Sequence, residues 1–105
     1  MIKILAFSIS ILLPFFAWSQ TTGIIRGHLQ DQNTQESIAG GLVGIEGTTL
    51  ATLSDAEGNY KLIVPVGTYN LKAAYIGYAP ILKFNISVSS GNDQIINFDL
   101  ILRHA

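Results

Sequence analysis

Apolar residues recur at every second position along much of this chain, and that period allows few folds. Successive side chains of a β-strand point to opposite faces, so such a segment has one apolar and one mostly polar face. The pattern predicts β-strands that each turn one face toward a core, with no amphipathic helix after residue 20. The clearest segments are 69–75, 82–88 and 96–102, with apolar positions Tyr69, Leu71, Ala73 and Tyr75; Leu82, Phe84, Ile86 and Val88; and Ile96, Phe98, Leu100 and Leu102.

Less regular segments add four expected strands, at 24–30, 42–46, 51–54 and 60–64. Their inward positions are Ile25, Leu29, Val43, Ile45, Tyr60, Leu62 and Val64. Seven short strands separated by turns are typical of an antiparallel β-sandwich, in which each sheet buries one face against the other. We therefore expect an all-β, seven-stranded antiparallel β-sandwich.

Two turns punctuate the expected strands. In 55–59 an aspartate, Asp55, begins the turn, Gly58 is its fourth residue and Asn59 follows. This order favours a type I turn in which Gly58 adopts a positive φ. In the second turn Pro65 presets its own φ and Gly67 closes the turn. We interpret all five residues as structural.

The N-terminal segment has the order of a secretory signal: Lys3, an apolar run from Ile4 to Phe16, and the small residues Ala17 and Ser19 flanking Trp18. We expect a signal-peptide helix over residues 1–19 and one domain over 20–105, with its core at 23–102. An uncleaved membrane anchor is the alternative, but the apolar run is shorter than the roughly 20 residues that a span needs.

The charge balance narrows the choice of partners. Cleavage after Ser19 leaves five basic and seven acidic residues, a net charge of −2. Nucleic acid and anionic lipid surfaces are therefore poor candidates, because both select basic surfaces. The chain has no cysteine, so the exported domain has to rely on its apolar core instead of on disulfides.

Several segments carry a family resemblance: 38–43, 46–49, 54–60, 64–69 and 75–78, preceded by Gly27. In this order they resemble the carboxypeptidase-regulatory-like domain, a transthyretin-like seven-stranded β-sandwich. The similarity covers roughly Gly23 to Leu102, with mild departures at Ser54, where threonine is usual, and at Gly44, where a branched residue is commoner.

The resemblance implies a location and a role. Such domains occur in Bacteroidetes-type bacteria as periplasmic N-terminal extensions of TonB-dependent outer-membrane receptors for nutrient uptake. They also occur as accessory modules beside peptidases or as stand-alone exported proteins. Both a stand-alone module and a piece of a longer receptor remain open for this chain.

Residues with catalytic or metal-binding chemistry are sparse. His28 and His104 lack the spacing of a metal site. Asp55, Glu57 and Asn59 alternate oxygens like the start of a calcium loop, but the closing glutamate is replaced by Val66. No nucleophile elbow is present. The sequence predicts no enzyme, no cofactor and no metal, and it leaves a weak calcium site as the alternative to a plain turn.

The expected function is therefore binding. Ile76 and Tyr78 lie in a segment that ends in proline, and we expect them either to form an exposed contact surface or, for Tyr78, to cap the end of the sandwich. The first hypothesis is a non-catalytic interaction or scaffold module in the periplasm or at the periplasmic face of the outer membrane, with a protein partner. The alternatives are a secreted protein and a carbohydrate-binding accessory module that uses Tyr60, Tyr75 or Tyr78.

Overall fold

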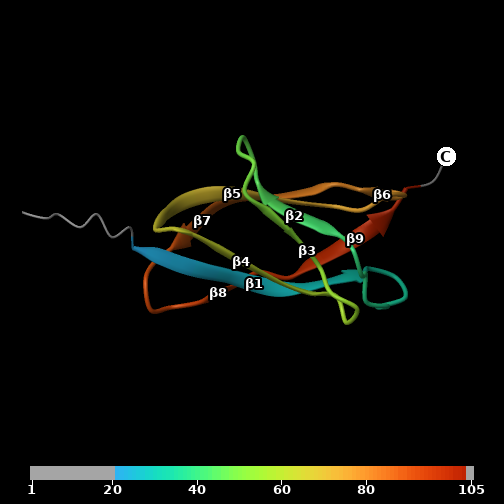
Figure 1. The fold of residues 1–105 in the computed structure, drawn as a ribbon. Helices are drawn as coiled ribbons and strands as arrows, with labels where there is room; N and C mark the ends of the chain where they lie inside the picture. The colour runs from blue at the N-terminus through green and yellow to red at the C-terminus, as the bar shows by residue number, and fades with distance from the viewer. Residues whose placement is uncertain (1–20, 104–105) are drawn as a thin grey trace, which may run out of the picture.

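A computed structural model describes residues 21–103 of the chain, which form nine β-strands in two facing sheets (Figure 1). The expected signal peptide over residues 1–19 and His104 lie outside the described residues. The strands are β1 (Thr22–Asp31), β2 (Leu42–Ile45), β3 (Ala51–Leu53), β4 (Asn59–Pro65), β5 (Gly67–Ala74), β6 (Tyr78–Ala79), β7 (Ile81–Val88), β8 (Gln94–Ile95) and β9 (Phe98–Leu102).

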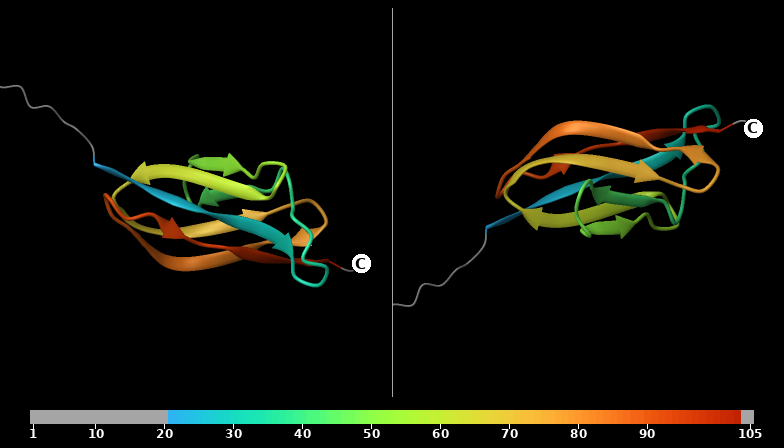
Figure 2. Two further views of the ribbon diagram at one scale, coloured as in Figure 1. Left: turned by 90° about the horizontal axis from the view of Figure 1, so that it is seen from below. Right: turned by 90° about the horizontal axis from the view of Figure 1, so that it is seen from above.

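The first sheet has the order β4-β1-β9-β6, with β8 also paired to β1, and the second has the order β3-β2-β5-β7. Figure 2 shows the two layers from opposite sides, with long β1 running through the first sheet and β5 beside β7 in the second. The all-β sandwich expected from the alternating pattern is confirmed. Within residues 21–103 no helix is long or apolar enough to span a bilayer.

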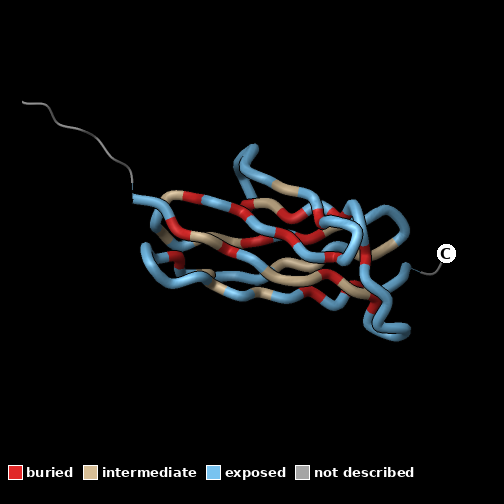
Figure 3. Tube along the Cα trace, turned by 60° about the horizontal axis from the view of Figure 1, so that its bottom comes forward, coloured by how far each residue is buried: buried red, intermediate tan, exposed pale blue. Residues whose placement is uncertain are grey.

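The core is built by both sheets, and buried residues recur along the strands of both layers (Figure 3). The inward positions expected from the four less regular segments are all buried. Phe98 on β9 is fully buried and is among the largest side chains in the core. The complete set is Ile25, Leu29, Ile38, Val43, Ile45, Tyr60, Leu62, Val64, Leu71, Ala73, Val88, Phe98 and Leu100.

The expected number of seven strands was wrong, because the structure has nine. The two additional strands, β6 and β8, contain two residues each, too few to show any period. The expected pairing was also too uniform, because β1 pairs in parallel with both β8 and β9. Alternation reports which face a residue occupies and says nothing of strand direction.

The expected inward face of 82–88 was wrong in its first half. Ile81 packs against the core, whereas Phe84 is 61% exposed. The cause is a β-bulge, because the β5–β7 register shifts so that Phe84 and Asn85 together oppose Asn70. A bulge inserts one residue and exchanges the two faces of the strand beyond it. Tyr75 and Leu102 were also expected to point inward and are instead exposed, because β5 ends at Ala74 and β9 ends at Leu102.

Candidate binding faces

The turn at 55–59 is built around the carboxylate of Asp55. Its Oδ1 accepts hydrogen bonds from the amides of Glu57 at 3.0 Å and Asn59 at 2.9 Å. Gly58 has a φ of +83°, as expected, and a Cβ there would lie 2.6 Å from the carbonyl oxygen of Leu29. These contacts favour a plain turn over a calcium loop, because the carboxylate already has backbone partners. Among residues 21–103 no three potential metal ligands of the His, Cys, Asp or Glu type gather at one point.

The second turn joins β4 to β5 through Pro65, Val66 and Gly67. The hydroxyl of Tyr69 donates to the carbonyl of Pro65 at 2.6 Å. A Cβ on Gly67 would lie 3.4 Å from that hydroxyl oxygen, in ordinary van der Waals contact with it. Pro65 therefore supplies the acceptor of this hydrogen bond, and Gly67 begins β5 directly after the turn.

Tyr78 is half-buried and packs against the core at one end of the sandwich. Its hydroxyl donates to Oδ2 of Asp31 at 2.7 Å, while the amides of Asn33 and Thr34 donate to Oδ1. The Thr34 amide and the Tyr78 hydroxyl hold the pKa of the Asp31 carboxyl below its ordinary value. This arrangement favours Tyr78 as a cap of the sandwich over Tyr78 as a contact residue.

Ile76, by contrast, is 86% exposed in the loop after β5. It adjoins a large apolar surface that the alternating pattern did not reveal. We name this surface the outer apolar face. It is the solvent side of the second sheet, with the following residues: Leu42, Ala51, Leu53, Ala74, Leu82 and Phe84.

The strand register brings these side chains together. Leu42 on β2 lies directly opposite Leu53 on β3 and Ala74 on β5, which makes one apolar row across three strands. Leu42 is 46% exposed and Leu53 is 60% exposed. Contiguous exposed apolar surface of this kind marks sites of interaction, whereas scattered single residues do not.

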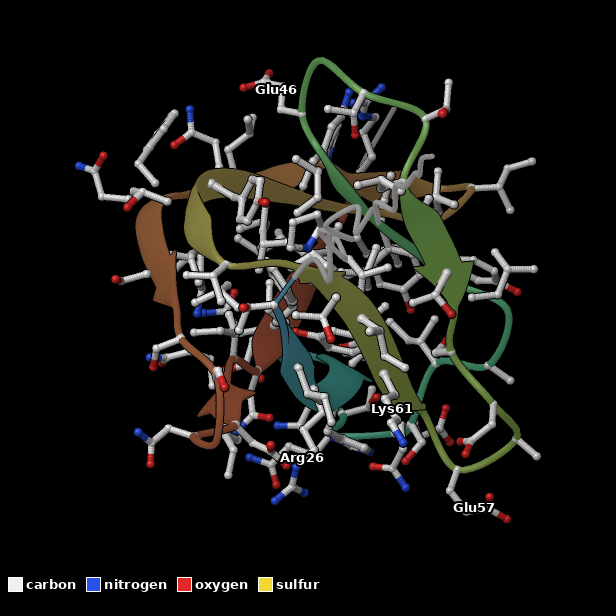
Figure 4. The ribbon with its side chains drawn as sticks, turned by 60° about the vertical axis from the view of Figure 1, so that its left-hand side comes forward. Arg26, Glu46, Glu57 and Lys61 are labelled. Atoms are coloured by element: carbon white, nitrogen blue, oxygen red, sulfur yellow. The ribbon has the colours of Figure 1, made fainter. Side chains whose placement is uncertain are left out.

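Two shallow hollows lie on this face and share Leu42 and Ala74. One, of about 340 Å³, runs under the 46–50 loop, which projects from the sheet in Figures 1 and 4. The other, of about 490 Å³, is lined by Gly40, Tyr75 and Ile76 as well as the shared pair. The hollows therefore extend the outer apolar face from the loop to Ile76.

Charge on the outer apolar face is confined to two places. Lys72 on β5 stands beside Gly44 and Leu82 and has no ion-pair partner in the described chain. Glu46 lies at the base of the projecting loop (Figure 4). The outer apolar face therefore presents apolar side chains around a single cation, Lys72.

A signal for this face does exist in the sequence. Adjacent apolar pairs such as Leu42-Val43 and Ile81-Leu82 place one member on each side of a strand. Strands that are apolar on both sides are usually covered on both sides. The alternating pattern assigned only one member of each pair to the core, correctly for Val43 and wrongly for Leu82.

The three tyrosines considered for sugar binding do not form one platform. Tyr60 is only 4% exposed, and its hydroxyl donates to the carbonyl of Ile96 at 2.6 Å. Tyr75 is exposed, and its ring lies 6.0 Å from that of half-buried Tyr78 at a tilt of 40°. One ring, that of Tyr75, is therefore open to a ligand.

Comparison with known proteins identifies the fold. The sequence model of the CarboxypepD_reg-like domain family matches residues 25–104. The chain belongs to this family. A curated relative, carboxypeptidase D of Anas platyrhynchos, is 28% identical over 76 residues, which cover 72% of this chain and 6% of the duck protein. Family membership confirms the resemblance in the turn and strand motifs and describes a regulatory type of β-sandwich.

Solved structures of low sequence identity share the fold. A chain in a type II cohesin–X-dockerin complex from Acetivibrio cellulolyticus has a TM-score of 0.60 at 22% identity. The match covers 76% of this chain and 56% of the chain in that complex. A candidate carbohydrate-binding protein from Bacteroides uniformis has a TM-score of 0.57 at 23% identity and covers 75% and 41%. This CarboxypepD_reg-like chain therefore spans 56% of the first of these structures and 41% of the second.

Proposed function

We propose that this CarboxypepD_reg-like domain is a non-catalytic interaction module that binds a partner protein through the outer apolar face. The observation that carries the proposal is the apolar row of Leu53, Leu42 and Ala74 across three strands, in which both leucines are exposed. The partner surface is apolar and supplies a carboxylate opposite Lys72, because a desolvated cation needs a counter-charge. The likeness to a chain in a cohesin–dockerin complex supports a role in protein assembly.

The proposed location is the periplasm or the periplasmic face of the outer membrane, in association with TonB-dependent nutrient uptake. Support comes from the signal-peptide order of residues 1–19 and from the family resemblance, which implies a periplasmic receptor extension among other settings. Cell fractionation of the protein carrying a C-terminal epitope tests the location. Recovery with the periplasm or the outer membrane is expected, and recovery only from the cytoplasm or the medium would contradict it.

Site-directed photocrosslinking in the native host tests the binding face. Benzoylphenylalanine replaces Phe84 on the outer apolar face or, as the matched control, Ile63 on the opposite sheet, which is 58% exposed. One envelope protein is expected to crosslink from position 84 and not from position 63. Equal crosslinking from both positions would refute the face, and crosslinking only to a second copy of this chain would replace the partner by a homodimer.

Titration of this domain with the purified partner protein that the crosslinking identifies then tests the role of the Lys72 charge. Lys72→Glu should weaken binding about tenfold or more, because a like charge replaces the expected ion pair. Lys61→Glu on the opposite sheet is the control and should leave the affinity within about twofold. Equal loss in both variants would contradict the proposed contact at Lys72.

A second candidate function is carbohydrate binding, favoured by the exposed ring of Tyr75 beside a hollow and by the likeness to the Bacteroides uniformis protein. Neutral glycans would stack on this ring. Calorimetric titration of wild type and Tyr75→Ala with a panel of neutral oligosaccharides tests it. Absence of any binding to the wild type would rule out this candidate.

A further inference from the structure

The outer surface of the first sheet has a different chemistry from the outer apolar face. A third hollow, of about 440 Å³, lies there over β1, β4 and the segment after β8. Two cations, Arg26 and Lys61, line it, and both lie along the lower edge of the molecule in Figure 4. The other lining residues are Gly27, His28, Asn59, Tyr60, Ile95 and Asn97.

The two cations are direct neighbours across the strand pair. Arg26 on β1 lies opposite Lys61 on β4. The carbonyl of Arg26 accepts from the amide of Ile96 on the other side of β1, so Arg26 and Lys61 occupy a non-hydrogen-bonded pair. Side chains are closest at such pairs, and like charges placed there repel each other.

Internal charge offsets only part of this repulsion. Nε of Arg26 bonds Oδ2 of Asp93 at 2.9 Å, which is the one ion pair in the described residues. This contact fixes the guanidinium through its Nε and leaves the two terminal nitrogens available as donors. Lys61 has no ion-pair partner within residues 21–103. An arriving anion would relieve the repulsion between two cations that are already in place.

A neutral donor is held in position beside the cations. The Oδ1 atom of Asn97 accepts from the amide of His28 at 3.0 Å, and its main-chain carbonyl accepts from Nζ of Lys83 at 2.7 Å. The side-chain Nδ2 of Asn97 therefore remains as a free donor on a fixed group. Ile95, which is also exposed, adds an apolar surface next to these donors.

We propose that this hollow binds one carboxylate-bearing sugar unit, such as a uronic acid residue of an acidic glycan. The guanidinium fork of Arg26 and the ammonium of Lys61 suit a carboxylate, the Asn97 amide suits a sugar hydroxyl, and Ile95 suits the apolar side of a sugar ring. Two cations match one anionic unit, whereas a polyanion or an anionic membrane needs a wider basic surface. The hollow lies on the opposite sheet from the outer apolar face, so this proposal and the protein-binding proposal can fail separately.

Calorimetry on the purified protein tests the ligand class. Tri-galacturonate is the probe, neutral galactotriose of the same linkage is the uncharged control, and tetra-glutamate and inorganic phosphate are the other anions. Tri-galacturonate should bind about tenfold or more tightly than each of the other three, and more weakly as salt rises. Equal affinity for galactotriose would refute the role of charge, and equal affinity for tetra-glutamate or phosphate would refute the sugar.

Variants locate the site. Arg26→Gln combined with Lys61→Gln should weaken tri-galacturonate binding about tenfold or more, and Asn97→Ala should weaken it less. Lys72→Gln on the outer apolar face is the matched control and should bind like wild type. Amide shifts in the ¹⁵N–¹H spectrum, confined to the hollow and seen in an otherwise unchanged spectrum, distinguish site loss from unfolding. Wild-type binding by the double variant would overturn the proposal.

Discussion

Replacement of Tyr60 by phenylalanine tests how the first sheet is held together. The Tyr60 hydroxyl on β4 reaches across β1 to the carbonyl of Ile96 at 2.6 Å. It can do so because Gly27 lies between them without a side chain, where a Cβ would come 1.8 Å from that carbonyl oxygen. Phenylalanine keeps the ring, whose centroid is 6.3 Å from that of Phe98. The substitution therefore removes one hydrogen bond and little else.

The expected cost follows from the burial of that bond. Tyr60 is buried, so the carbonyl of Ile96 would lose its partner where water has poor access, which costs about 1–3 kcal/mol. In a domain of this size each kcal/mol lowers Tm by about 4–8 °C, so Tyr60→Phe should melt roughly 4–24 °C lower. Thermal unfolding followed by circular dichroism measures this. Tyr75→Phe, which removes an exposed hydroxyl, is the control and should change stability by less than about 0.5 kcal/mol.

The same residue predicts a dependence on alkaline pH. Burial raises the pKa of the Tyr60 hydroxyl above its ordinary range. A tyrosine in the unfolded chain ionises near pH 10, so the stabilisation is complete below about pH 10 and is lost as pH rises toward the folded pKa. The bond to Asp31 and burial also raise the pKa of Tyr78. Tyr60→Phe should therefore lose part of the alkaline destabilisation. Identical Tm values for Tyr60→Phe and Tyr75→Phe, with identical alkaline profiles, would refute a stabilising role for the hydrogen bond between Tyr60 and Ile96.

Three further substitutions test the core, a turn and a cap. Phe98→Ala empties a fully buried site and should cost about 3–5 kcal/mol by urea unfolding, so an equally stable variant would remove β9 from the core. Gly58→Val places a branched side chain at a φ of +83° and should cost about 1–2 kcal/mol or more, so an unchanged melting curve would contradict the turn. Asp31 has a lowered pKa, so its contribution is present above about pH 4 and is lost as pH falls through the folded value. Asp31→Asn should be less stable at neutral pH and lose part of the acid dependence, measured as the urea midpoint at neutral and acid pH.

How far the fold could be predicted depended on how regular each strand is. β4 and most of β9 keep strict alternation, and the residues expected inside, such as Leu62 and Leu100, are buried. The expectation failed on β7, where Asn85 adopts a φ of +59° in the bulge and its amide donates to Oδ1 of Asn70. Asparagine tolerates this conformation better than most residues, so the presence of Asn85 is compatible with a bulge at this position of β7. Whether a bulge forms there depends on the partner strand, which the sequence of β7 does not specify.

The candidate sites were less predictable than the core. The turn residues could be identified because turn chemistry is local, as for Gly58. The outer apolar face and the Arg26–Lys61 pair depend on which strands become neighbours, and that arrangement joins residues far apart in the sequence. Tyr78 was doubtful for the same reason, since its partner Asp31 lies on another strand.

The edges of both sheets favour binding through faces over binding by strand addition. Proteins protect edge strands by keeping them short or by adding bulges, lysines, prolines and inward-pointing charges. β3 and β6 are short edges, and β4 carries Lys61 and ends at Pro65. On β7 the bulge turns Lys83 inward, with Nζ 5.2 Å from the ring centre of Phe98. The same bulge turns Phe84 outward, so the feature that blocks this edge also enlarges the outer apolar face.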